Sequence, residues 1–347
     1  MRRQSKQLHI GNVLVGGDAP VSVQSMTKTD THNIEATVRQ IKELEDAGCE
    51  IIRLAVLDEE AAVALHEIKR QVSIPIVADI HFDYRLAIQA IKSGVDALRL
   101  NPGNIGSNDR VEAVIREAKP REIPIRIGVN AGSLPKDLAD QDMPLHEKMS
   151  VAALRHVKIL EDLDFDLIKV SLKASDVLTT VKAYETIAKQ IPYPLHIGIT
   201  EAGTEYCGVV RSSAGLGILL NEGIGDTMRV SLTADPIKEV KAAYEILDAL
   251  NIRSRKAKLI SCPTCGRTQA NVFRLAKEME EALETVYKPI KVAVMGCAVN
   301  GPGEAKDADI GVACGKGMGI LFKHGVEFAT VKEDEIIPRM LEEIERL

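Results

Sequence analysis

The feature that most constrains the fold is a repeated unit, in which a short β-branched apolar run is followed by a helix-like segment. Eight such runs occupy the first three-quarters of the chain. Most are apolar until their carboxyl end, as strands buried on both faces are. Eight β-then-α units favour a TIM (β/α)8 barrel over an open doubly wound sheet. The predicted strands are Val21–Met26, Ile51–Val56, Ile74–Ile80, Ala97–Pro102, Ile125–Asn130, Leu167–Leu172, Leu195–Thr200 and Thr227–Leu232.

The segments between these runs repeat apolar residues with a period near 3.6, which predicts helices that pack on the barrel. Asn33 and Asp235 are expected N-caps, the second followed by Pro236 at the first helical position. Aromatic residues make up only 3% of the chain, so the core must consist of aliphatic side chains, the usual filling of a parallel barrel. The clearest predicted helices are Ile34–Ala47, Ala61–Gln71 and Leu145–Leu163.

The chain has three further parts. Residues 8–20 are predicted to form a hairpin that turns at Gly16–Gly17 and closes the barrel bottom. The basic stretch 251–256 is a predicted linker after a barrel domain of residues 1–250. Residues 257–347 have a mixed texture that predicts a small α+β domain.

Charge and hydropathy exclude several classes of protein. A net charge of -6 without a dominant basic face argues against a nucleic-acid binder. No apolar run approaches the ~18 residues needed to cross a membrane, and no apolar segment follows the N-terminal arginines as in an export signal. We therefore expect a cytoplasmic protein. In that reducing compartment, six cysteines indicate metal binding or catalysis rather than disulfides.

The predicted strands end in polar residues, and the carboxyl ends of barrel strands carry the chemistry in TIM barrels. Five of these residues are cations, which would repel each other at one mouth unless an anion joined them. Ion pairs with Asp79, Glu201 and helix-end acids could explain any single cation, but few acids are available for all five. A phosphate or diphosphate ligand is therefore favoured. The cations are Arg53, Arg99, Arg126, Lys173 and Arg229, and their polar neighbours include Gln24, Ser25, Asn101, Asn130, Ser171, Thr200 and Ser231.

Other strand-end features allow two interpretations. A histidine such as His81 is more often packed than catalytic, but its place two residues after Asp79 favours a functional role. The loop Asn101–Gly106 could hold phosphate on backbone N–H groups or could be a simple tight turn. Gly215 and Gly217 indicate helix packing.

Three cysteines near the carboxyl end predict a metal centre. Cys262 and Cys265 form a CxxC motif, and Cys297 opens the Gly- and Pro-rich segment that runs to Glu304. Such a loop exposes N–H groups that can bond to cluster sulfurs. Three thiolates leave one position for a weaker ligand, for which Glu304 is the nearest candidate and Cys314 its rival. Structural zinc with three cysteines remains an alternative to an iron–sulfur cluster.

The remaining cysteines have no such neighbours in the sequence. Cys49 follows an expected helix end and is interpreted as a small buried hydrophobe, and Cys207 stays unassigned.

Eight motifs, spread from about residue 3 to the end, together resemble the bacterial two-domain 4-hydroxy-3-methylbut-2-enyl diphosphate synthases of the non-mevalonate isoprenoid pathway. They are Val23–Thr27, Ala78–Asp83, Leu100–Gly106, Gly128–Ser133, Lys173–Asp176, Gly198–Gly203, Cys262–Cys265 and Asn300–Glu304.

The resemblance implies a TIM barrel joined to a [4Fe-4S] domain related to sulfite and nitrite reductases. It implies two-electron reductive ring opening of 2-C-methyl-D-erythritol 2,4-cyclodiphosphate, with electrons from flavodoxin or ferredoxin, in a homodimer whose sites form between subunits. The implied cluster ligands are Cys262, Cys265, Cys297 and Glu304. The implied diphosphate contacts are Arg53, Arg99, Arg126, Asn130, Lys173, Arg229 and Ser231, and Asp79, His81, Glu201 and Asn300 would surround the reacting carbons.

The chemistry of these residues agrees with that reaction. A cluster with an exchangeable oxygen ligand can act as Lewis acid and electron source, while the cations orient the diphosphate. Glu201 or His81 would manage a proton near the departing hydroxyl. Two rival hypotheses are a non-redox metal-dependent hydro-lyase acting on a phosphorylated substrate and a ligand-binding barrel with structural zinc.

Overall fold

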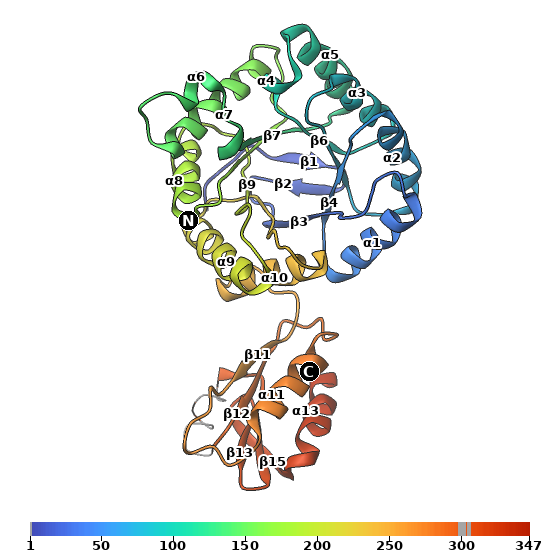
Figure 1. Cartoon of the computed structure of the whole chain (residues 1–347). Helices are drawn as coiled ribbons and strands as arrows, with labels where there is room; N and C mark the ends of the chain where they lie inside the picture. The colour runs from blue at the N-terminus through green and yellow to red at the C-terminus, as the bar shows by residue number, and fades with distance from the viewer. Residues whose placement is uncertain (1, 298–302, 304–306) are drawn as a thin grey trace. The chain divides into compact units, whose positions relative to one another are not determined.

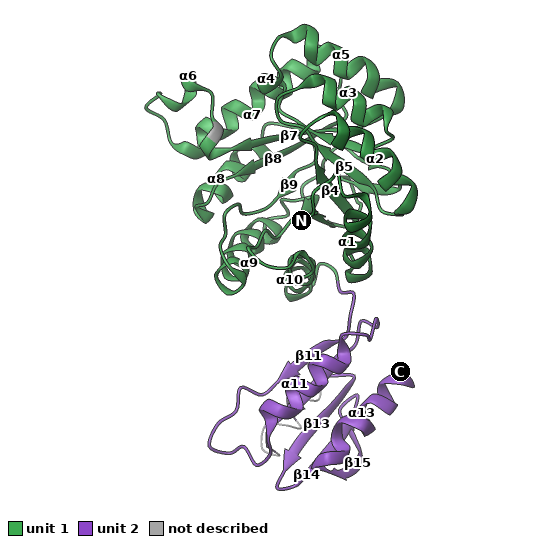
Figure 2. Ribbon diagram, turned by 45° about the vertical axis from the view of Figure 1, so that its right-hand side comes forward, with its two compact units in different colours: residues 1–253 green, residues 254–347 purple. Residues whose placement is uncertain are grey.

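A computed structural model shows two compact units, residues 1–253 and 254–347 (Figure 2). It describes residues 2–297, 303 and 307–347. The two units are considered separately below.

The first unit is a parallel barrel, as predicted (Figure 1). Its sheet has the order β8-β7-β6-β5-β4-β3-β10-β9, and a parallel bridge from Val170 to Leu195 brings its two ends together. Helices surround the strands. The barrel strands are β3 (Ser22–Met26), β4 (Ile51–Ala55), β5 (Ile76–Asp79), β6 (Ala97–Arg99), β7 (Ile125–Asn130), β8 (Ile168–Lys173), β9 (His196–Ile197) and β10 (Thr227–Met228).

The helices follow the predicted pattern. The Asn33 side chain accepts a hydrogen bond from the backbone N–H of Ala36, and Asp235 accepts one from that of Ile237, so both predicted N-caps are confirmed. The helices are α1 (Ile34–Ala47), α2 (Glu59–Gln71), α3 (Tyr84–Lys92), α4 (Pro102–Ile105), α5 (Asn108–Ala118), α6 (Lys136–Ala139), α7 (Leu145–Glu161), α8 (Val177–Ala188), α9 (Glu205–Asn221) and α10 (Pro236–Ala249).

Several strands end earlier than predicted, because side chains replace the regular ladder near the mouth. The Asn101 amide bonds both to the N–H and to the carbonyl of Gly128, at 2.8 and 2.7 Å, and Pro102 then begins α4. At Gly198 a Cβ would lie 2.8 Å from the carbonyl oxygen of Arg229, so β9 and β10 approach each other too closely for a side chain there. The shortened strands leave their polar ends in loops at the mouth.

The N-terminal hairpin consists of β1 (Leu8–Ile10) and β2 (Val13–Val15). Ile10 and Val15 pack with Ile51, Val77 and Ala97, near the start of three barrel strands, so the hairpin lies against the barrel bottom. The predicted Gly16–Gly17 turn was wrong, because the chain reverses at Gly11 and Asn12. Gly11 takes the positive φ of 55° that this tight turn requires, whereas the other two glycines follow β2.

The second unit contains a mixed five-stranded sheet in sequence order (Figure 1). Its first three strands are parallel and its last two antiparallel to their neighbours. Apolar residues of two helices in the described part of the unit, such as Leu275 and Met340, pack on sheet residues such as Val292 in one core. The elements are β11 (Lys258–Ser261), α11 (Val272–Leu283), β12 (Lys291–Met295), β13 (Ile310–Gly315), β14 (Met318–Lys323), β15 (Val326–Lys332) and α13 (Ile336–Glu345).

Among the described residues, no helix has both the length and the apolar character needed to cross a membrane.

Candidate functional site

The barrel interior places charged residues at its carboxyl end. Residues alternate between the two faces of a strand, so Arg126, Gly128 and Asn130 of β7 share the inner face, while Ile125 and Ile127 pack in the outer core. The same alternation brings Lys169, Ser171 and Lys173 of β8 inside. We call the charged set at this end the rim. It comprises Arg53, Asp79, Arg99, Arg126, Lys173 and Arg229, the charges that the sequence indicated. Arg126 is the second residue of β7 rather than a strand end, and it joins the set through its register partner Arg99.

Asp79, at the end of β5, joins two of the rim arginines. Its carboxylate lies 3.6 Å from Arg53 and 3.3 Å from Arg99, and it is 3.6 Å from His81. Burial would raise the pKa of Asp79, but Arg53, then His81, Arg99 and Arg126, outweigh burial and hold the pKa well below its usual range. Asp79 is therefore ionised at neutral pH. The predicted ion pairing of strand-end cations with Asp79 is confirmed for Arg53 and Arg99.

His81 lies beside this pair at the mouth. Both of its ring nitrogens are 3.2 Å from Nη1 of Arg99, and half of its side chain is exposed. An exposed imidazole next to a fixed cation and a fixed anion can meet a ligand and exchange a proton with it.

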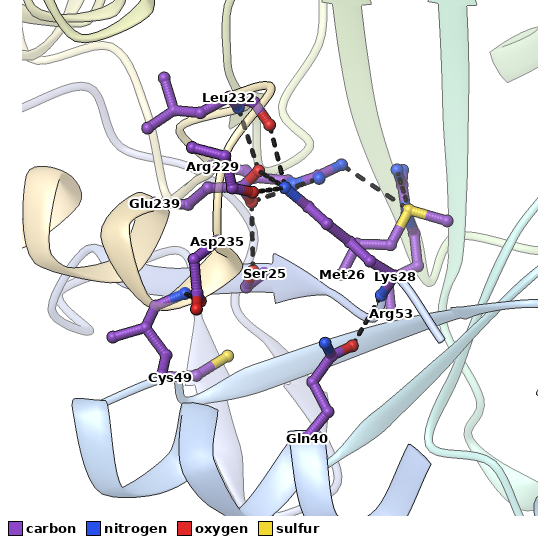
Figure 3. Close-up of polar contacts among 12 residues, drawn as sticks. Ser25, Met26, Lys28, Gln40, Cys49, Arg53, Arg229, Leu232, Asp235 and Glu239 are labelled. Carbon is purple, nitrogen blue, oxygen red and sulfur yellow. Dashed lines mark hydrogen bonds and ion pairs between the residues drawn. The ribbon is translucent and has the colours of Figure 1, made fainter. Parts of the chain in front are cut away.

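A second carboxylate, Glu239 of α10, holds the other side of the rim (Figure 3). Its Oε2 lies 3.3 Å from Nη2 of Arg229 and accepts a hydrogen bond from Ser25, while Oε1 accepts one from the N–H of Leu232 at 3.0 Å. Lys28 is 3.3 Å from the same carboxylate. Glu239 therefore links β3, the β10 loop and α10, and it fixes the Arg229 guanidinium.

Glu239 and Lys28 were not predicted from the sequence, because neither residue lies at a strand end. The signal was the position of Glu239 on α10, among Pro236, Val240 and Ala243 on the buried face of the helix. A carboxylate in such a stripe needs a buried cation.

A thioether separates two rim arginines (Figure 3). Met26 Sδ lies 2.8 Å from Nη2 of Arg53 and 3.7 Å from Nη1 of Arg229. Because a thioether is a weak acceptor, these guanidinium groups keep much of their capacity to bind an anion.

The rim contains more cationic donors than acceptors. Arg126 donates to Ser171 Oγ at 2.7 Å, but its Nε and Nη2 are buried without a partner, as are the Nε atoms of Arg99 and Arg229. Among the described residues, Arg126 and Lys173 have no carboxylate partner. Burial, then Arg53 and Arg99, lower the pKa of Arg126, yet a guanidinium stays charged in proteins. Buried donors without acceptors indicate a site made for an anion.

The other predicted barrel residues lie along the same chain segments. Asn130 ends β7 and is half-buried, as is Ser231 in the loop after β10. Glu201, in the loop after β9, is exposed and has a φ of 52°, in the left-handed region that is costly for residues other than glycine. Such strain concentrates at functional sites.

The glycine segments serve packing. The N–H of Gly103 donates to His156 at 3.0 Å, and a Cβ there would lie 2.6 Å from the imidazole, which favours the simple-turn interpretation over a phosphate cradle. A Cβ on Gly215 of α9 would lie 2.6 Å from Ile199, so the predicted helix packing is confirmed there, whereas a Cβ on Gly217 would meet nothing within 4 Å and the prediction is wrong for that residue.

In the second unit, the fold gathers the predicted cluster cysteines at one end of the sheet. Cys262 follows β11 and Cys297 follows β12, which are parallel neighbours paired through Ser261 and Val294. Gln269 donates to the carbonyl of Gly296 at 3.2 Å, which ties the CxxC loop to the segment of Cys297. Thr264 has a φ of 66°, and its N–H lies 3.4 Å from the Cys262 sulfur. An N–H aimed at sulfur stabilises thiolate character, which suits a metal ligand.

The ligand set is not closed within the described residues, which contain no group of three His, Cys, Asp or Glu able to hold a metal ion. The predicted residues Asn300 and Glu304 lie outside the described residues.

The remaining cysteines differ from these three. Cys314 of β13 is buried in the apolar core, where burial, then Glu333 and Cys262, raise its pKa to about 11. Burial likewise raises the pKa of Cys49 to about 12, and its thiol donates to the Ile51 carbonyl at 3.1 Å. Cys314 lies inside the apolar core rather than in a loop after a strand end, so it is a poorer candidate ligand than the other three. Cys207 is exposed on α9.

Solved structures share the barrel architecture. The chain is similar to dihydropteroate synthase from Stenotrophomonas maltophilia, with a TM-score of 0.55 at 15% identity over 71% of this chain and 98% of that one. This likeness concerns the fold alone.

Sequence comparison extends over both units. Residues 5–244 match the GcpE TIM-barrel domain, and residues 258–346 match the GcpE protein C-terminal domain. The chain is 63% identical over 346 residues to the 4-hydroxy-3-methylbut-2-en-1-yl diphosphate synthase (flavodoxin) of Dehalococcoides mccartyi, covering 100% of this chain and 99% of the relative. It is 59% identical to the enzyme of the same name from Thermodesulfovibrio yellowstonii, covering 99% of each. By full-length similarity and by both domain matches, the chain belongs to the GcpE family of 4-hydroxy-3-methylbut-2-en-1-yl diphosphate synthases.

Proposed function

We propose that this chain catalyses the two-electron reductive ring opening of 2-C-methyl-D-erythritol 2,4-cyclodiphosphate to 4-hydroxy-3-methylbut-2-enyl diphosphate, as an iron–sulfur oxidoreductase of isoprenoid precursor synthesis. The observation that carries this function is the excess of buried cationic donors at the rim, in a chain that matches the family along its whole length. The electrons come from flavodoxin, the donor that the names of the relatives specify, or from ferredoxin.

We assign the substrate's diphosphate to the barrel domain, residues 1–250. Arg126 and Lys173 form no ion pair with a carboxylate in the described chain, while Asp79 and Glu239 hold the other arginines in position. Anchoring a group far from the breaking bond turns binding energy into orientation. The proposed contacts are Arg53, Arg99, Arg126, Asn130, Lys173, Arg229 and Ser231.

We assign a [4Fe-4S] cluster to residues 257–347, joined to the barrel by linker 251–256. Its ligands would be Cys262, Cys265 and Cys297, with Glu304 as the fourth. When bound, the cluster supplies electrons and Lewis acidity to the reaction. The thiol positions at the ends of two parallel strands and the N–H directed at Cys262 suit such a group.

A proton must reach the departing hydroxyl, and two side chains can supply it. His81 is exposed beside Asp79, and Glu201 is exposed in a strained loop. Asp79 itself stays charged, so we give it the role of orienting His81 and two arginines rather than of an acid. Asn300 would bind near the reacting carbons.

Assembly and location follow from the same function. We propose a homodimer in which the active site is completed between subunits, with no nucleic-acid or membrane partner. Cluster-binding thiols need a reducing compartment, so we infer the cytoplasm.

The test is anaerobic turnover of the cyclic diphosphate with reduced flavodoxin, after iron and acid-labile sulfide have been measured. We expect an iron-containing protein that forms the open diphosphate only with a low-potential reductant. Loss of water from the cyclic diphosphate without any reductant, to a product at the same oxidation level, would instead favour the hydro-lyase hypothesis. A colourless, zinc-containing protein that binds the substrate without converting it would favour the binding-protein hypothesis.

A further inference from the structure

Lys169 is a buried lysine that the proposed function does not use. It lies on the inner face of β8 beside Arg126, two inward-facing positions before Lys173. The residue is 2% exposed, and its Nζ is buried without a hydrogen-bond partner. Leaving a charged ammonium in such a place is costly, so its charge needs an explanation.

Cations surround Lys169 on several elements. Its register partner on β7 is Arg126, Arg53 acts on it from β4, and Lys173 follows on its own strand. The arginines cannot relieve this repulsion by losing a proton, because guanidinium groups stay charged. A lysine can, because its amine loses a proton readily when it is buried.

The acidic group that acts on Lys169, Asp226, offers little compensation. Asp226, which precedes β10, is engaged by Arg2 at 3.0 Å, by Ser5 at 2.9 Å and by the N–H of Leu195 at 2.7 Å. The Asp226 carboxylate is therefore already neutralised and hydrogen-bonded at the bottom of the barrel. Burial, then Arg126, lower the pKa of Lys169 well below that of an ordinary lysine, against a smaller opposing effect of Asp226.

His196 of β9 faces the same interior but cannot supply an anion. Its Nδ1 is 2.7 Å from Thr227 Oγ1, and its Nε2 has no partner. Burial and then Arg126, Lys173 and Lys169 lower the pKa of His196 well below its ordinary value. The imidazole is thus neutral, so it neither adds to nor offsets the cationic charge around Lys169.

We propose that Lys169 is a proton-binding site linked to the rim, neutral in the ligand-free barrel and protonated when an anionic diphosphate occupies the rim. This inference rests on the proposed function. The step is the addition of a solvent proton to the Nζ lone pair, with no other bond changed. The bound anion offsets the positive charge of Arg126 and its neighbours. The repulsion that disfavours the Lys169 ammonium is then smaller, so the pKa of Lys169 rises.

The linkage between proton binding and diphosphate binding determines how the affinity changes with pH. A group whose pKa rises on binding takes up a proton, so affinity for the diphosphate falls as pH rises between the free and bound pKa values of Lys169. For one linked proton the dissociation constant should increase by about tenfold per pH unit in that window.

The test is titration calorimetry of the anaerobic full-length holoenzyme with the cyclic diphosphate, without reductant so that no turnover occurs. Measuring the heat at one pH in two buffers of different protonation enthalpy gives the number of protons exchanged. The phosphoryl groups of this cyclic anhydride each carry one strongly acidic oxygen, so they do not titrate near neutral pH. We expect uptake of about one proton per bound substrate.

Two variants assign the proton. Lys169→Met should still bind the diphosphate but take up about one proton fewer. Lys182→Met, which removes an exposed lysine of α8, should match the wild type. Without ligand, Lys169→Met should melt at a higher temperature than the wild type, because it removes a buried polar group without a partner.

The outcomes separate the two proposals. Binding without proton uptake, or equal uptake by Lys169→Met and the wild type, overturns the role of Lys169 and leaves the substrate site intact. Failure of the wild-type holoenzyme to bind the cyclic diphosphate overturns the substrate site, and the linkage with it.

Discussion

The rim of the barrel and the cysteine-bearing end of the second unit differ in how completely the protein alone organises their side chains. At the rim, Asp79 and Glu239 already hold three arginines through contacts of 3.3 to 3.6 Å. In the second unit, parallel strands bring Cys262 and Cys297 to one end of the sheet, but the described residues contain no complete metal-binding group.

The difference shows how each site obtains its geometry. Oppositely charged side chains can organise one another within the fold, because every cation that is paired offsets part of the cost of burying its partner. Thiolates repel each other and gain their main stabilisation from a metal, so a metal site is often completed only when the metal binds. Substrate binding and cluster binding should therefore be separable by mutation.

The largest expected effect comes from Cys297→Ser. Loss of a cluster ligand should reduce iron and acid-labile sulfide and lower reductive turnover by more than about 100-fold, since even residues around metal ligands cost 10–100-fold. Calorimetry should still detect the cyclic diphosphate at the rim. The matched control, Cys314→Ser, should keep its iron, and a loss of iron there would make Cys314 the fourth ligand.

Arg126→Met tests the barrel rim, the other of the two sites compared. Removing the guanidinium with unpaired donors should raise the KM for the cyclic diphosphate by about 100-fold, the equivalent of one or two charged hydrogen bonds at about 1.5–3 kcal/mol each. Iron content should not change. Arg116→Met, which removes an exposed arginine of α5, serves as the control and should leave KM as it is. A parallel loss of iron in Arg126→Met would mean that the two sites are not separable.

Glu239→Gln should have a smaller effect, because Arg229 keeps its charge and loses only its orientation. We expect KM to rise by about tenfold with little change in kcat, which corresponds to about 1.4 kcal/mol. Lys28→Met removes the other cation held by Glu239, and it should leave KM closer to the wild-type value. Equal effects of both variants on KM would show that Glu239 acts through general stability rather than by positioning Arg229.

The smallest effect concerns acid stability. The pKa of Asp79 is depressed in the folded barrel, so its ion pairs stabilise the fold fully above the unfolded value of about 3.9. That stabilisation is lost as pH falls from there through the lower folded pKa. Asp79→Asn should therefore flatten the loss of thermal stability over this range in calorimetric melting. An unchanged acid profile would mean that the arginines do not hold Asp79 ionised.

The sequence predicted the barrel well, because strand and helix periods are local properties. The eight parallel strands follow the predicted order, and α1 matches its predicted bounds of Ile34–Ala47. Strand ends were less accurate, since contacts that are distant in sequence, such as that of the Asn101 side chain with Gly128, replace the regular ladder there.

The site was predicted in part for the same reason. Charges at strand ends are visible in a sequence, as Arg53, Asp79 and Arg99 were. Glu239 belongs to a helix, and only the closed barrel shows that it reaches Ser25, 214 positions away along the chain. The role of Lys169 depends on the absence of a partner, which no sequence pattern reveals.

The contact between Glu239 and Ser25 also bears on how the molecule is made. β3 pairs with β10, and Arg2, near the N-terminus, binds Asp226 just before β10. The first part of the barrel therefore cannot complete its contacts until the last part has been synthesised. Until α10 has left the ribosome, β3 has one unpaired edge open to other chains. Joining segments so far apart costs chain entropy and slows folding. The mouth that we propose binds the diphosphate should therefore be among the last parts of the barrel to form, and a nascent chain has no such mouth before that point.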